Sequence, residues 1–98
     1  MARFSDGVAA QLLADCERHC CMCLRWCGQR MQIHQIVPES NGEAGDYDNG
    51  IPVCLDCDAE IESRSNMGRR FTLEELRQHR DRWFTTVRDR PEILIRAA

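Results

Sequence analysis

The sequence predicts a small α+β domain in which zinc holds a β-hairpin between flanking helices. Two Cys-x-x-Cys pairs enclose a β-branched stretch typical of a strand, and helical patterns lie before the first pair and after the second. The pairs are Cys20/Cys23 and Cys54/Cys57. A chain of 98 residues buries only about two-thirds of its unfolded surface, so a metal staple is a reasonable supplement to its core. We therefore expect one domain over residues 1–98, with its core at residues 20–62.

The first expected element is a helix over about residues 7–18. Ser5 or Asp6 can cap it, because a short polar side chain accepts a hydrogen bond from a free amide of the first turn. Its apolar residues recur at helical spacing and are Val8, Ala9, Leu12, Leu13 and Cys16. We expect this face to pack on the core.

A β-hairpin is expected after the first thiol pair. Residues 30–37 are rich in strand-forming side chains and end at Pro38. A polar, glycine-bearing loop over residues 39–46 turns the chain back to a short apolar segment, residues 51–53. A helix is then expected over residues 58–63, with Gly68 as its break.

A long C-terminal helix is expected over about residues 72–88, because Thr72 and Glu75 have the spacing of a capping box. One side of this helix is predicted to face the core rather than to stack on bases. That side carries Leu73, Leu76, Arg80, Trp83, Phe84 and Val87. Pro91 ends the pattern, and the apolar tail over residues 93–95 is consistent with an edge strand or with docking onto a partner.

The two thiol pairs predict one structural zinc held by Cys20, Cys23, Cys54 and Cys57, because each Cys-x-x-Cys turn supplies two corners of a tetrahedron. A disulfide framework is disfavoured by an N-terminus with only a brief apolar patch. A redox pair is disfavoured by the repeated spacing. The other thiols, Cys16, Cys21 and Cys27, are expected to be buried or spare, with Cys21 or Cys27 as alternative ligands.

The net charge of −3 conceals an uneven distribution. Residues 39–62 hold eight acids and no base, whereas residues 64–90 hold eight arginines and four acids. This arrangement suits a metal site beside a phosphate-contacting surface, and a solvated helix with ion pairs is the alternative. No apolar run reaches the roughly 18 to 20 residues of a membrane span, so we expect a cytoplasmic protein without a membrane partner.

The order of motifs is more specific than the composition. The first thiol pair is followed by His34-Gln35-Ile36-Val37-Pro38, a glycine-bearing loop, Asp48-Asn49, and the apolar segment that ends in the second pair. In this order, residues 20–62 resemble the HNH nuclease family. Residues 68–84 are similar to a subgroup of small bacterial HNH proteins. The resemblance implies a ββα-metal (treble-clef) fold, in which two strands and a helix enclose a catalytic metal. A structural zinc holds together the bottom of this fold.

The resemblance also implies a second metal site and a general base. His34 and Asp58 stand at ligand positions, and Glu62, one helical turn later, would complete a site for Mg²⁺ or another divalent cation. Asn49 matches the middle asparagine that orients the base. Gln35 stands where the family carries its general-base histidine, and a carboxamide cannot accept a proton near neutral pH.

Three functions remain open. The first is a metal-dependent DNA endonuclease, weak or inactive because of Gln35, with arginines that contact the DNA backbone. These arginines are Arg69, Arg70, Arg77 and Arg80. The second is a catalytically inactive zinc module that binds nucleic acid or a protein partner, such as a subunit of a defence or restriction complex. In the third, His34 is an ordinary strand histidine, and Asp58 and Glu62 are helix carboxylates favoured by the dipole.

Overall fold

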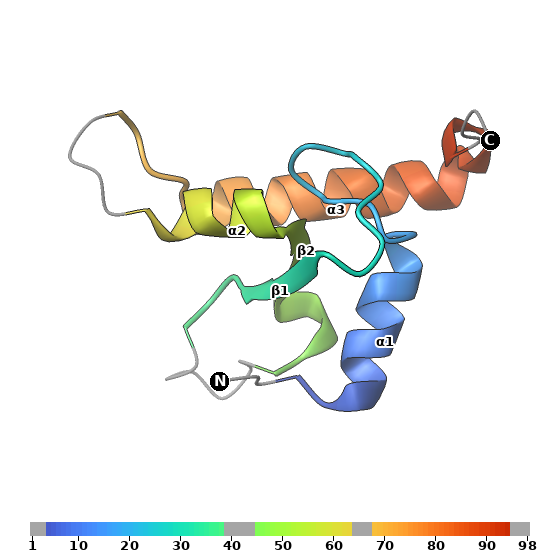
Figure 1. Ribbon diagram of the computed structural model, residues 1–98, viewed down its shortest axis with the longest axis horizontal. Helices are drawn as coiled ribbons and strands as arrows, with labels where there is room; N and C mark the ends of the chain where they lie inside the picture. Colours follow the sequence, from blue (N-terminus) through green and yellow to red (C-terminus); the bar gives the residue numbers. More distant parts are fainter. Residues whose placement is uncertain (1–3, 39–44, 64–67, 95–98) are drawn as a thin grey trace.

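The computed structural model describes residues 4–38, 45–63 and 68–94. Within them it confirms the α+β prediction, because three α-helices surround one antiparallel sheet of two strands. Figure 1 shows α3 running along one side of the molecule, with α2 beside it, the hairpin next to both and α1 on the far flank. Most of the predicted loop, residues 39–44, and the last residue of the predicted tail lie outside the described residues.

The hairpin is formed by β1 (Met31–Gln35) and β2 (Gly50–Cys54), paired from Met31↔Cys54 to Gln35↔Gly50. A 3₁₀ turn, η1 (Tyr47–Asn49), leads into β2. The buried side chain of Asn49 accepts a hydrogen bond from Val37 N at 2.8 Å and donates one to Val37 O at 3.0 Å. Asn49 thus ties the chain that leaves β1 to the chain that enters β2.

The outer edge of β2 is covered rather than open. In an antiparallel pair, alternate residues point their backbone groups away from the partner strand. Gly50 O accepts a hydrogen bond from Arg80 Nε at 2.7 Å, and Pro52 O accepts one from Cys21 N at 3.0 Å. Pro52 is tolerated here because its missing N–H would point away from β1. These contacts fix α3 and the first thiol loop against the sheet.

The opening helix, α1 (Asp6–Asp15), is capped by Ser5, whose Oγ accepts a hydrogen bond from Val8 N at 3.1 Å. It ends three residues before the predicted boundary at residue 18. Glu17 and Arg18 adopt left-handed conformations, with φ of 57° and 55°, and turn the chain toward the thiols.

Two helices follow the hairpin. The first, α2 (Leu55–Glu62), begins three residues before the predicted start, because the Cys54 sulfur caps it by accepting a hydrogen bond from Cys57 N at 3.3 Å. Since α2 ends at Glu62, Gly68 does not break it, contrary to the prediction. The long helix, α3 (Leu73–Asp89), has the predicted cap, with Thr72 Oγ1 accepting from Glu75 N at 3.1 Å.

The predicted burial of Leu73 and the edge-strand alternative for the tail were wrong. Leu73 is half exposed, because it lies on the first turn of α3, beyond the reach of the core. Residues Pro91–Leu94 form a 3₁₀ helix, η2, instead of an edge strand, and Leu94 packs against the core. The predicted buried face of α3 is otherwise present, with Leu76, Arg80 and Trp83 buried.

Cysteine sulfur makes up an unusual share of the core. Its buried residues are Cys16, Cys20, Cys21, Ile36, Ile51, Val53, Cys54, Leu76 and Trp83. The indole of Trp83 donates a hydrogen bond to Cys16 O at 3.0 Å and lies 5.4 Å from the buried ring of His19. The C-terminal helix is therefore fastened to the end of α1 directly beside the thiol pairs.

Candidate metal centres

The structure brings together the four cysteines of the predicted zinc site. The sulfurs of Cys20, Cys23, Cys54 and Cys57 all lie within 4.8 Å of one another, and Cys23 Sγ lies 3.9 Å from Cys54 Sγ. Sulfurs arranged tetrahedrally at about 2.3 Å from a zinc ion would be about 3.8 Å apart. The cluster therefore has the size that structural zinc requires.

Backbone amides point at the sulfurs of this cluster. Cys20 Sγ accepts hydrogen bonds from Met22 N at 3.3 Å and Cys23 N at 3.4 Å, and Cys54 Sγ accepts from Cys57 N at 3.3 Å. Such donors favour a thiolate, which is the form that binds a metal. The same Cys-x-x-Cys geometry appears in the loop before β1 and at the start of α2, so the two halves meet at the end of the hairpin where Met31 pairs with Cys54.

The thiol pKa values differ across the cluster. Burial raises the pKa of Cys20 and of Cys57, so these thiols need a nearby positive charge to ionise near neutral pH. Burial also opposes ionisation of Cys23, but hydrogen bonds from Arg25, together with those of Cys20 and Cys54, outweigh it and lower the pKa to about 7. A cation at the centre would supply the charge that Cys20 and Cys57 need.

The three remaining cysteines lie outside this cluster, as the sequence predicted. Cys16 and Cys21 are fully buried, and burial raises the pKa of Cys16 to about 11 and that of Cys21 further. Cys27 is half-buried and donates a hydrogen bond from its sulfur to Arg25 O at 3.2 Å. Their environment is that of small core or spare thiols.

A second group of metal-binding side chains joins β1 to α2. His34 Nδ1 lies 3.4 Å from Asp58 Oδ1 and 3.2 Å from Glu62 Oε2. Asp58 and Glu62 are one helical turn apart and so share a face of α2. The side chains of His34, Asp58 and Glu62 are 17%, 29% and 59% exposed, so the group is open to solvent. One imidazole and two carboxylates suit a hard or borderline divalent cation.

This second group borders an open groove of about 920 Å³ that Gln35, Arg70 and Phe71 also line. The Nε2 of Gln35 is buried and has no hydrogen-bond partner among the described residues. The other two histidines of the chain lie elsewhere, since His19 packs on Trp83 and His79 faces Glu75 along α3 at 4.0 Å. His34 is thus the one imidazole lining the groove.

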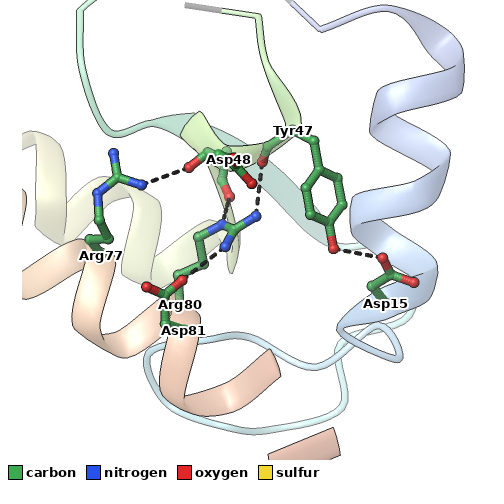
Figure 2. Close-up of polar contacts among 7 residues, drawn as sticks. Asp15, Tyr47, Asp48, Arg77, Arg80 and Asp81 are labelled. Carbon is green, nitrogen blue, oxygen red and sulfur yellow. Dashed lines mark hydrogen bonds and ion pairs between the residues drawn. The ribbon is translucent and has the colours of Figure 1, made fainter. Parts of the chain in front are cut away.

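The four predicted DNA-contacting arginines have different surroundings. Arg69 and Arg70 are exposed, and Arg77 donates a hydrogen bond to Asp48 O at 2.9 Å. Arg80 is only 5% exposed, a placement that does not favour the predicted phosphate contact. Its guanidinium donates a hydrogen bond to Gly50 O at 2.7 Å. Figure 2 shows its further hydrogen bonds to the Tyr47 carbonyl and to Asp81.

Sequence reasoning did not single out three residues that the structure places in these networks. Tyr47 donates a hydrogen bond to Asp15 Oδ2 at 2.6 Å, and its ring lies 5.0 Å from the Arg80 guanidinium carbon. Arg25 reaches two sulfurs of the thiol cluster. Its position two residues after Cys23 is the one local signal that could have indicated this contact. Tyr47 and Asp15 are 32 residues apart and carry no such signal.

Comparison with known proteins agrees with this geometry. Within the described residues, none of the helices is both long and apolar enough to cross a membrane. No curated protein matches the chain. The family model described as HNH endonuclease matches residues 20–64, the segment that contains both candidate metal centres, as the motif order predicted. Residues 20–64 are therefore similar to the HNH endonuclease family.

Proposed function

We propose that the chain is a metal-dependent DNA endonuclease whose hydrolysis is slow because Gln35 occupies the general-base position. The observation that carries this proposal is the second metal centre, in which Asp58 and Glu62 lie 3.4 Å and 3.2 Å from the His34 imidazole. His34 lines an open groove, where water could hydrogen-bond to its imidazole. It therefore does not need Asp58 or Glu62 as a hydrogen-bond partner. This openness favours a ligand site over an ordinary strand histidine.

The residues of this centre have separate roles in the proposed reaction. His34, Asp58 and Glu62 would hold a divalent cation such as Mg²⁺, which when bound polarises a phosphodiester and stabilises the leaving oxygen. Asn49 holds the ends of the hairpin together through Val37 and so fixes the strand that carries His34 and Gln35. The zinc centre supplies the rigid base from which α2 presents Asp58 and Glu62.

Gln35 limits the chemistry. Its carboxamide can hydrogen-bond a water molecule or a phosphate oxygen, and its Nε2 has a free donor among the described contacts. It cannot take the proton of the attacking water near neutral pH. General-base assistance contributes about 10²–10⁴-fold, so hydrolysis should be slow while metal and DNA binding persist.

DNA is the expected partner because exposed arginine borders the groove. Arg70 lines the groove beside the second metal centre, and Arg69 is its exposed neighbour. A guanidinium binds phosphate oxygens bidentately, without regard to base sequence. Arg77 retains exposed surface for a more peripheral contact, whereas the donors of Arg80 are committed to the protein.

Gln35 also favours a second candidate function, a zinc module without catalytic turnover. In that case residues 20–64 would bind nucleic acid or a protein partner, as a subunit of a larger defence or restriction complex. Both candidates keep the zinc fold. They differ in whether restoring an imidazole at position 35 restores cleavage.

The deciding experiment measures nicking of supercoiled plasmid in Mg²⁺, Mn²⁺ or Zn²⁺. The unmodified chain should nick weakly or not at all, and Gln35→His should raise the rate by about 10²-fold or more. Adding Asp58→Ala should abolish this gain. The matched control is Asp56→Ala, which removes an exposed carboxylate of α2 outside the metal group.

DNA binding at several salt concentrations, measured on the same proteins, separates the two candidates. Affinity should fall steeply with salt, and Arg70→Ala should weaken it. A Gln35→His protein that binds metal and DNA but stays inert would favour the module. Strong nicking by the unmodified chain, unaffected by Asp58→Ala, would show that the active site lies elsewhere.

A further inference from the structure

We propose that Arg25 donates hydrogen bonds to sulfurs of both halves of the zinc centre and thereby strengthens zinc binding. Its Nε lies 3.5 Å from Cys23 Sγ, and its Nη2 lies 4.0 Å from Cys54 Sγ. Cys23 belongs to the thiol pair before the hairpin and Cys54 to the pair after it. One guanidinium therefore contacts both pairs. The inference rests on the zinc centre proposed above and concerns its affinity, not the nuclease chemistry.

Charge gives Arg25 its effect. A zinc ion with four thiolate ligands carries two net negative charges, and this excess is spread over the sulfurs. A guanidinium beside two of those sulfurs offsets part of it through charge-assisted N–H···S hydrogen bonds. Backbone amides already serve Cys20 and Cys54, so Arg25 adds a charged donor to a set of neutral ones.

The loop backbone fixes Arg25 in this place. Leu24 has a left-handed φ of 67°, which reverses the chain directly after Cys23. Hydrogen bonds from Leu24 N to Cys20 O at 2.8 Å and from Cys20 N to Arg25 O at 2.9 Å close the turn. Arg25 O also accepts the hydrogen bond from Cys27 Sγ. The position of Arg25 against the sulfurs thus follows from the same turn that forms the first half of the metal site.

An arginine is required at this position for geometric reasons. The guanidinium presents separate N–H donors in a fixed plane, so Nε and Nη2 can serve two sulfurs at once. A lysine would keep the positive charge but has a single nitrogen. Arg25→Lys therefore separates the effect of charge from the effect of bridging.

The test is zinc affinity of the full chain, measured by competition with a chromophoric chelator. Loss of an outer-shell partner typically weakens metal binding about 10–100-fold, and we expect Arg25→Ala to fall in this range. Arg25→Lys should lie between Arg25→Ala and the unmodified chain. Arg30→Ala is the matched control, because Arg30 is an exposed arginine of the same loop for which the described residues show no contact to sulfur. It should bind zinc as the unmodified chain does.

Cobalt substitution supplies a readout that a merely structural role would not move. Replacing zinc by Co²⁺ gives a thiolate-to-cobalt charge-transfer band, whose energy depends on hydrogen bonds to sulfur. Arg25→Ala and Arg25→Lys should shift this band while the ligand-field bands keep their tetrahedral pattern. If Arg25→Ala does not fold, Arg25→Lys carries the test by the same two measurements.

Two results would overturn the inference. Zinc affinity and a cobalt spectrum unchanged in Arg25→Ala, or in Arg25→Lys where only that variant folds, would refute Arg25 alone and leave the zinc centre intact. An unmodified chain that binds no zinc would refute the centre itself, and the role of Arg25 with it.

Discussion

Each of the three histidines of the chain has a defined place in the structure, and histidine is the usual general base near neutral pH. His19 is packed on Trp83, His79 faces Glu75 on α3, and His34 lies among the carboxylates of the second centre. None stands at position 35. His34, Asp58, Glu62 and Asn49 occupy the positions that the proposed reaction needs. The single substitution Gln35→His should therefore test whether the missing general base is the reason for slow hydrolysis.

Tyr47 offers a residue-scale prediction that a single spectroscopic signal can check, because it is the only tyrosine. Burial and its hydrogen bond to Asp15 raise its pKa to about 12. Its ionisation, followed by near-ultraviolet absorbance, should therefore have a midpoint near pH 12. Asp15→Asn should lower that midpoint, because it removes the carboxylate that disfavours the phenolate, whereas Asp56→Asn should leave it unchanged.

The raised pKa of Tyr47 also predicts how stability depends on pH. An unfolded tyrosine ionises near pH 10, so neutral Tyr47 contributes its full stabilisation below about pH 10. This contribution is lost as the pH rises through about 12. A midpoint at the ordinary tyrosine value in the folded protein would contradict the contact with Asp15.

At the scale of elements, the sequence located the three α-helices and both strands of the described residues, but only some of their ends. The caps at Ser5 and Thr72 were predictable because each depends on a side chain and an amide three residues away. The start of α2 was not, because its cap is the Cys54 sulfur, a residue type outside the usual capping set. The end of α1 depends on left-handed Glu17 and Arg18, which neither residue type signals.

Arg80 shows why a correct helical pattern can still mislead about function. The helical spacing of Arg80 predicted that it lies on the buried face of α3. Because it is an arginine, it was also predicted to contact a DNA phosphate. Its acceptors, the carbonyls of Tyr47 and Gly50, are more than 25 residues away in the sequence. Its guanidinium also lies 4.5 Å from the Phe84 ring centre. Only the tertiary structure could show that this arginine joins α3 to the entrance of β2.

We predict that Arg80→Ala destabilises the fold by about 3 kcal/mol, because it leaves the buried carbonyl of Gly50 and the part-buried carbonyl of Tyr47 unpaired. The matched control, Arg82→Ala, removes an exposed arginine of the same helix and should change stability by less than about 0.5 kcal/mol. Urea unfolding followed by circular dichroism measures both. Equal stability of the two variants would contradict the internal role of Arg80.

At the scale of the whole molecule, the two thiol pairs join segments that the hairpin separates. Cys20 and Cys23 precede β1, whereas Cys54 and Cys57 lie at the junction of β2 and α2. Sequence spacing predicted these ligands because each Cys-x-x-Cys turn is a local feature. The second metal centre could be predicted only from the resemblance to HNH nucleases, since His34 and Asp58 come from different elements. No local sequence pattern indicated that the side chains of Tyr47, Asp15 and Arg80 would lie together.

Zinc should therefore be part of the folded molecule and not an accessory to it. The apolar core is small and contains sulfurs of the cluster itself, including buried Cys20 and Cys54. In such small domains the free energy of metal binding is largely the free energy of folding. We expect one zinc per chain, and we expect a strong chelator to abolish the near-ultraviolet circular dichroism of the tryptophans.

Cysteine variants should separate ligands from spare thiols in the same measurement. Cys57→Ser removes a predicted ligand at the start of α2 and should lose both zinc and cooperative unfolding. Cys27→Ser changes a half-buried thiol outside the cluster and should keep both, because its sulfur contacts backbone groups and is not one of the four clustered sulfurs. Metal analysis that finds no zinc, with cooperative unfolding unchanged in chelator, would show that the apolar core suffices and that the four sulfurs are close for another reason.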